Sequence, residues 1–169
     1  ALALNAEATR LLIGAPAAAF DGTRIELLSI EPADPAAMRA LPALLSLPAA
    51  WRPGDAAAVL LVDPPGAYAL RDHLLGALLD RGTAVLELDA NTARGFSAEA
   101  DRNPPPPTAE SLLADLAMGA EAFRHYGAGL VVALGHGLGG EAVLLAAARG
   151  QDFAAHAALG PGEPRFLAG

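Results

Sequence analysis

The stretch Val131-Val132-Ala133-Leu134-Gly135-His136-Gly137-Leu138-Gly139-Gly140 decides the fold of this chain. Its first four residues are apolar, which is typical of a strand buried on both faces of a parallel sheet. The glycines that follow indicate a tight turn, and residues 141–149 then show a helical pattern that ends at Gly150. A strand, a glycine turn and a helix in this order are a building unit of α/β proteins.

The same alternation of strand and helix runs through most of the chain. Apolar runs at residues 56–62 and 84–88 predict two further buried strands, and residues 153–159 predict a fourth parallel strand. Residues 68–81 and 111–125 predict amphipathic helices, with a long polar loop over residues 91–107. We therefore expect an α/β fold, a three-layer sandwich in which helices cover both faces of a mostly parallel sheet.

The N-terminal part follows a different pattern. Residues 9–13 and 24–30 are short β-like runs with the turn signal Asp21-Gly22 between them, which predicts an antiparallel hairpin. Asp34-Pro35 indicates the start of a short helix, and later prolines limit that helix and predict a loop. Residues 1–55 are thus expected to add a β-hairpin and a short helix to a single domain that spans residues 1–169.

The composition excludes several classes of partner. The net charge is −8, every basic residue is an arginine, and no basic stripe is present, which argues against nucleic acids and anionic membranes. Without cysteine, the chain has no disulfide and no thiolate metal site. None of the histidines shows the spacing of metal ligands, so we expect no metal and no cofactor. These histidines are His73, His125, His136 and His156.

The glycine turn resembles a known catalytic motif. Gly135-His136-Gly137-Leu138-Gly139 is similar to the G-x-S-x-G nucleophile elbow of α/β hydrolases. Residues 21–25 resemble the opening hairpin of these enzymes, and residues 79–89 resemble their passage from helix to strand. Arg94-Gly95-Phe96-Ser97 is similar to a loop of the dienelactone hydrolase-like branch. The resemblance covers roughly residues 20–159 and implies a parallel sheet with a site at its carboxyl edge.

Three departures from that family imply that catalysis is lost. Gly137 stands at the serine position, and glycine has no oxygen to attack a carbonyl. The loop Asp63-Pro64-Pro65-Gly66 replaces one that donates an N–H to the oxyanion, which proline cannot do. The chain ends at Gly169, so the acid and histidine of the family's triad have no place. The resemblance therefore implies a truncated pseudoenzyme, an accessory or binding subunit.

Two other functions remain open for the same glycines. The first is a dienelactone hydrolase-like carboxylic ester hydrolase with an unusual or removed nucleophile. The second is dinucleotide binding through Gly135, Gly137 and Gly140, since they match G-x-G-x-x-G between a strand and a helix. That motif requires an acidic residue about 20 residues further on. Gly160 lies there instead, and Glu163 is the nearest acid.

Polar residues at strand ends suggest a small-ligand pocket. Asp63 and Asp89 each follow a predicted strand, and His136 lies in the turn. The carboxyl ends of parallel strands are where α/β folds bind ligands, so these three side chains could share one crevice. Helix capping and loop solvation are the alternative interpretation of the two aspartates.

The sheet and the first residue lead to expectations about partners and location. A shortened sheet leaves an unpaired edge, so we expect a protein partner or self-association to cover it. The chain begins at Ala1 without a methionine, which is typical of a protein after signal-peptide removal. We therefore expect a periplasmic or secreted protein. Ordinary methionine removal from a cytoplasmic protein is the alternative.

Overall fold

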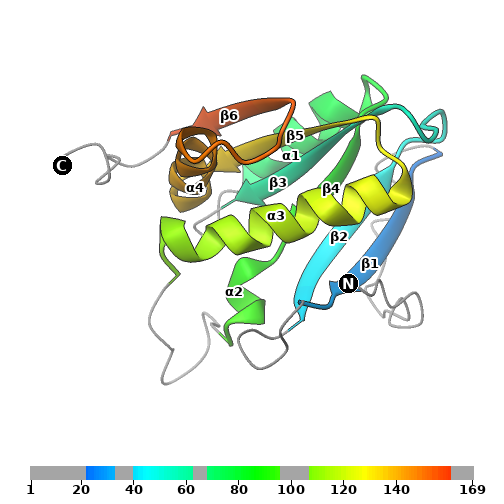
Figure 1. Cartoon of the computed structure of the whole chain (residues 1–169). Coiled ribbons are helices and arrows are strands. Elements are labelled where there is room, and N and C mark those ends of the chain that lie inside the picture. The colour runs from blue at the N-terminus through cyan, green and yellow to red at the C-terminus, as the bar shows by residue number, and fades with distance from the viewer. Residues whose placement is uncertain (1–21, 33–39, 63–67, 96–106, 161–169) are drawn as a thin grey trace.

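The computed structural model of the chain describes residues 22–32, 40–62, 68–95 and 107–160. These residues form strands and helices in regular alternation after an all-β start (Figure 1). The strands are β1 (Arg24–Ile30), β2 (Leu41–Leu47), β3 (Ala56–Val62), β4 (Ala84–Leu88), β5 (Leu130–His136) and β6 (Ala155–Leu159). The helices are α1 (Tyr68–Leu79), α2 (Ala90–Ala93), α3 (Ala109–Tyr126) and α4 (Leu138–Ala148).

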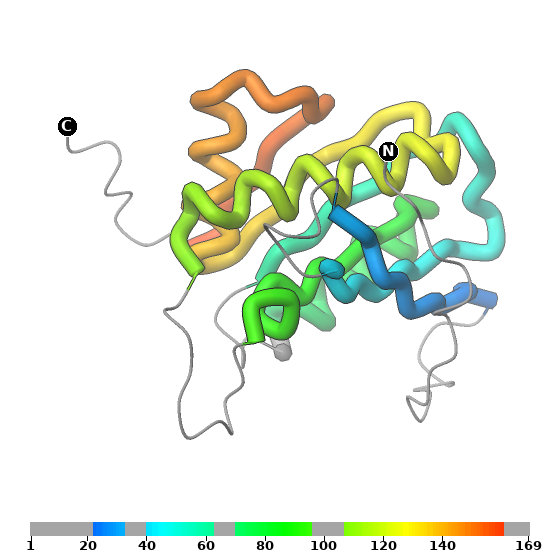
Figure 2. Tube along the Cα trace, turned by 60° about the horizontal axis from the view of Figure 1, so that its bottom comes forward, coloured from blue at the N-terminus to red at the C-terminus, as the bar shows by residue number. Residues whose placement is uncertain are grey.

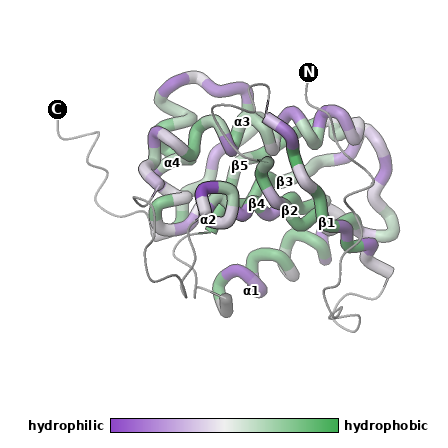
Figure 3. Tube along the Cα trace, turned by 90° about the horizontal axis from the view of Figure 1, so that it is seen from below, coloured by the Kyte–Doolittle hydropathy of each residue, from purple (hydrophilic) through white to green (hydrophobic). Residues whose placement is uncertain are grey.

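The strands form one mixed sheet in the order β1-β2-β4-β3-β5-β6. β1, β2 and β4 pair antiparallel, whereas β4, β3, β5 and β6 run parallel. β1 and β6 therefore lie at opposite sides of the molecule (Figure 2). α3 and α4 cover one face of the sheet, with α2 on the same side, and α1 lies on the other face (Figure 3). The predicted three-layer α/β fold is confirmed.

The central strands are apolar on both faces because each face meets helices. In β3, Val59 and Leu61 belong to the large core under α3 and α4, together with the fully buried Phe123. The intervening Leu60 points to the opposite face and packs with Leu75 of α1. This alternation between two cores is the reason that β3 reads as a continuous apolar run. β3 and β4 have the predicted bounds.

The region after β1 corrects one prediction. The expected short helix and loop should have included residues 41–47, but this segment is the strand β2, paired with both β1 and β4. Leu41, Ala43 and Leu45 point into the core at every second position, a pattern that outweighs the helix limit inferred from Pro42. The partner of β1 is thus β2. Residues 9–13, predicted to be that partner, and the helix start at Asp34 lie outside the described residues.

Capping groups fix where the helices begin and end. Thr108 accepts a hydrogen bond from the Ser111 N–H, and the Ser111 hydroxyl accepts one from the Thr108 N–H, so α3 begins with a capping box. α3 ends at Gly127, which has a φ of 90°. α2 lies where a polar loop was expected, and the Asp89 carboxylate accepts from the Thr92 N–H at its start.

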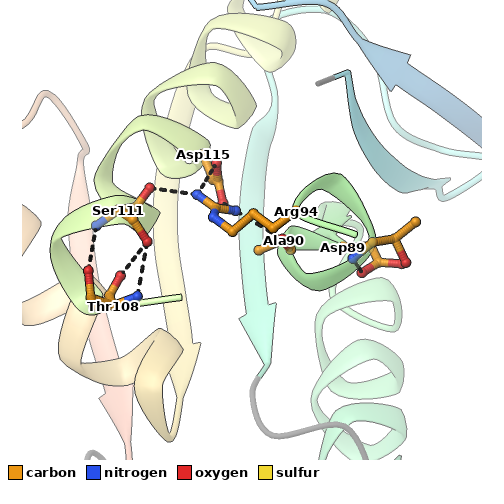
Figure 4. Close-up of polar contacts among 7 residues, drawn as sticks. Asp89, Ala90, Arg94, Thr108, Ser111 and Asp115 are labelled. Atoms are coloured by element: carbon orange, nitrogen blue, oxygen red, sulfur yellow. Dashed lines mark hydrogen bonds and ion pairs between the residues drawn. The ribbon is translucent and has the colours of Figure 1, made fainter. Parts of the chain in front are cut away.

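A buried ion pair joins α2 to α3 (Figure 4). The Arg94 guanidinium lies 2.7 Å from the carboxylate of Asp115, which is fully buried in α3, and it also donates to the Ala90 and Ser111 carbonyls. Burial raises the pKa of Asp115, and the ion pair with Arg94 opposes that rise. Arg94 therefore supplies the counter-charge for a carboxylate that would otherwise be buried without one.

Removing Arg94 should strongly destabilise the protein. Arg94→Ala leaves the Asp115 carboxylate buried without its counter-charge, which should lower the free energy of unfolding by about 3 kcal/mol. Urea denaturation followed by circular dichroism measures this change. The matched control is Arg149→Ala, which removes an exposed arginine paired with Glu110 at 2.8 Å and should cost under about 1 kcal/mol. Equal losses in the two variants would contradict the role given to Arg94.

Candidate functional site

The turn between β5 and α4 has a backbone conformation that only glycine adopts readily. Gly137 follows the last residue of β5 and caps α4, with φ 60° and ψ −127°. No non-glycine residue of the described chain has a positive φ, so this position is strained for any side chain. The turn projects residue 137 at the carboxyl end of a strand that lies between β3 and β6.

Two further glycines let α4 start immediately against the sheet. A Cβ built on Gly135 would lie 2.1 Å from the carbonyl oxygen of Gly139. A Cβ on Gly139 would lie 2.1 Å from the carbonyl oxygen of Leu61 in β3. Both distances are far inside van der Waals contact with backbone atoms, so neither position accepts a larger residue without a shift of the chain. Packing therefore requires the glycines two residues before and two residues after residue 137.

The turn presents backbone but no reactive side chain. Gly137 has only hydrogens, so it offers no hydroxyl, thiol or carboxylate. Its N–H donates to the Leu159 carbonyl oxygen at 3.3 Å, and its own carbonyl accepts from the Glu141 N–H at 3.1 Å. Both main-chain groups of Gly137 thus hold the turn in place.

His136 is the nearest side chain that could take part in proton transfer. It is the last residue of β5 and stands in register with Val62 on one side and Leu159 on the other. Its Nδ1 is buried and has no hydrogen-bond partner among the described residues. Its Nε2 lies near Gly160, where an added Cβ would come within 3.4 Å. No described carboxylate orients this imidazole, as a catalytic histidine would require.

The other two residues of the predicted pocket are not brought to His136 by any described contact. Asp89 follows β4, which is separated from β5 by β3, and its exposed carboxylate caps α2. Asp63 lies outside the described residues. A shared pocket of Asp63, Asp89 and His136 therefore stays a prediction.

Asp115 is the residue of greatest structural consequence that sequence reasoning missed. Arg94 belongs to a motif that was identified in the sequence, but its partner Asp115 does not. What indicates Asp115 in the sequence is a carboxylate within the apolar face of α3, next to Leu112 and Leu116, which are both buried. A charge in such a stripe requires a partner, and an arginine on a neighbouring element is the usual one.

A hollow lies at the end of β5 that is remote from Gly137. It has a volume of about 200 Å³ and is lined by Arg124, Leu130 and Asp152, among others. The Arg124 guanidinium already donates to the carboxylate of Asp152 at 3.0 Å and to its carbonyl oxygen. This cation is therefore satisfied within the chain.

No described helix is long and apolar enough to cross a membrane.

Solved structures share this arrangement of strands and helices. A putative dienelactone hydrolase from Klebsiella pneumoniae matches 75% of the chain with a TM-score of 0.60 and 20% identity. The protein TT1662 from Thermus thermophilus matches 84% with a TM-score of 0.58 and 23% identity. Brefeldin A esterase, a bacterial homologue of human hormone-sensitive lipase, matches 85% with a TM-score of 0.56 and 19% identity. The chain has the α/β-hydrolase fold of these proteins.

The likeness is one of fold over part of each protein. The chain spans 55%, 58% and 40% of the lengths of these three structures, respectively. No protein-family model matches the sequence, and no curated protein matches it either. The predicted resemblance to α/β hydrolases of the dienelactone hydrolase type is confirmed as a resemblance of fold, and activity has to be argued from the residues themselves.

The contact between α4 and β3 should make Gly139 intolerant of even a methyl group. Glycine to alanine within a helix normally stabilises a protein by up to about 1 kcal/mol. At Gly139 the added Cβ would meet the Leu61 carbonyl, so we expect a loss of roughly 2–3 kcal/mol in the free energy of unfolding. Gly150→Ala is the control, because its Cβ would meet nothing within 4 Å and only its φ of 67° is strained. A stabilised Gly139→Ala variant would refute the close contact.

Proposed function

We propose that this chain is a non-catalytic binding module with an α/β-hydrolase fold. The observation that carries the proposal is Gly137, which keeps the backbone geometry of a nucleophile elbow and lacks a nucleophile. The flanking close contacts of Gly135 and Gly139 explain why the turn persists without chemistry, since the packing of α4 depends on it. The fold is retained where the reactive group is absent.

A chain without a nucleophile would lack most of the rate enhancement of a serine hydrolase. Removing the nucleophile of a serine hydrolase costs on the order of 10⁶-fold in rate, and each oxyanion donor is worth roughly 2.7–4 kcal/mol. No described histidine hydrogen-bonds or pairs with a carboxylate, so no described base is oriented to activate water or a substitute nucleophile. The remaining backbone donors alone would give little rate enhancement.

The two alternatives have less support. An ester hydrolase with an unusual nucleophile would have to use His136, whose Nδ1 has no described partner to orient the ring. Dinucleotide binding would use the glycines for close approach to a phosphate. In this chain Gly135 and Gly139 already lie against backbone carbonyls, which accounts for their presence by packing alone. Gly160, at the end of β6, provides no carboxylate for a ribose.

The free edge of β6 supports partner binding. The described sheet has one strand, β5, beside β6 and none beyond it. Residues 155–159 read Ala-His-Ala-Ala-Leu and contain neither a charge nor a proline, the residues that usually protect an edge. The other edge strand, β1, has an ion pair between Arg24 and Glu26 at 2.7 Å. We infer that β6 pairs with a strand from a partner protein or from a second copy of the chain.

A location in the cell envelope remains part of this proposal. Fractionation of the native cells, with detection of the chain in the periplasmic fraction, tests it. Recovery in the cytoplasmic fraction alone would contradict it.

An ester hydrolysis assay tests the absence of catalysis. Release of p-nitrophenol from p-nitrophenyl acetate should proceed at the rate of the buffer, and a fluorophosphonate probe should not label the chain. Gly137→Ser should remain unlabelled and inactive, because no described base lies ready to activate the new hydroxyl. Gly150→Ser is the matched control, since it places a serine at another glycine of positive φ.

The opposite results would select an alternative. Turnover by the unaltered chain that is lost in His136→Ala would establish an esterase with an unusual nucleophile. Labelling of Gly137→Ser but not of Gly150→Ser would show that the rest of a hydrolytic site is intact, which the proposal denies. Saturable binding of NAD would establish the dinucleotide alternative.

Association through β6 has its own test. The Leu159 carbonyl accepts from the Gly137 N–H, so Leu159 faces β5, and by alternation the N–H of Ala158 points away from β5 and toward the free edge. Ala158→Pro removes this donor and should leave the melting temperature nearly unchanged. Light scattering and co-purification from the native source should show association for the unaltered chain and its loss in the variant. A monomer without partners, or a complex that survives the substitution, would contradict edge pairing.

A further inference from the structure

We draw no further inference here: the strongest candidate, the largely apolar face of β5 and β6 on the side of the sheet where α1 lies, carries nothing further, because no feature of the described residues shows what would cover it.

Discussion

The contact on which the architecture depends is the one between the first turn of α4 and the backbone of β3. Gly139 lies so close to the Leu61 carbonyl that no side chain fits between helix and strand. Gly135 makes the same approach to Gly139 itself, and Gly137 supplies the positive φ that turns the chain within one residue. α4 then packs on both β5 and β6, the last two parallel strands. A turn that strict is maintained by packing, whatever chemistry it supports.

This dependence on packing explains why the turn can keep its shape with glycine at residue 137. Glycine at this position avoids the strain that any side chain would bear at φ 60°, and so favours the folded state. A side chain held in such a conformation costs stability. Glycine at the centre of the elbow is therefore compatible with a stable, well-packed sheet.

Much of the fold was predictable because a strand that is buried on both faces consists almost entirely of apolar residues. The runs at Ala56–Val62 and Ala84–Leu88 gave the bounds of β3 and β4 directly. β2 was not predicted, because its apolar side chains alternate around Pro42 and a proline reads more strongly as a helix limit than as part of a paired strand. α4 begins earlier than its pattern indicated, because residues 139 and 140 are poor helix formers that close packing requires.

The candidate site was harder to predict than the scaffold. The elbow could be recognised because its glycines follow from backbone geometry, and the capping role of Asp89 is local to α2. The neighbours of His136 and the partner of Asp115 depend on elements far apart in the sequence. Of the pocket expected at the strand ends, the structure describes Asp89 and His136, and it places the carboxylate of Asp89 on the backbone of α2. The sequence predicts which element carries a given side chain. The order of the strands in the sheet decides which side chains from other elements lie next to it.

If β6 pairs with another chain as proposed above, the unlike edges of the described sheet limit how the molecules can assemble. A head-to-tail array would have to add β6 of one molecule to β1 of the next, against the paired charges of Arg24 and Glu26. Pairing of β6 with β6 around a twofold axis would instead use, in both molecules at once, the edge of the described sheet that has neither a charge nor a proline. Such an assembly closes at two subunits, so an exposed edge need not lead to open-ended growth into fibres.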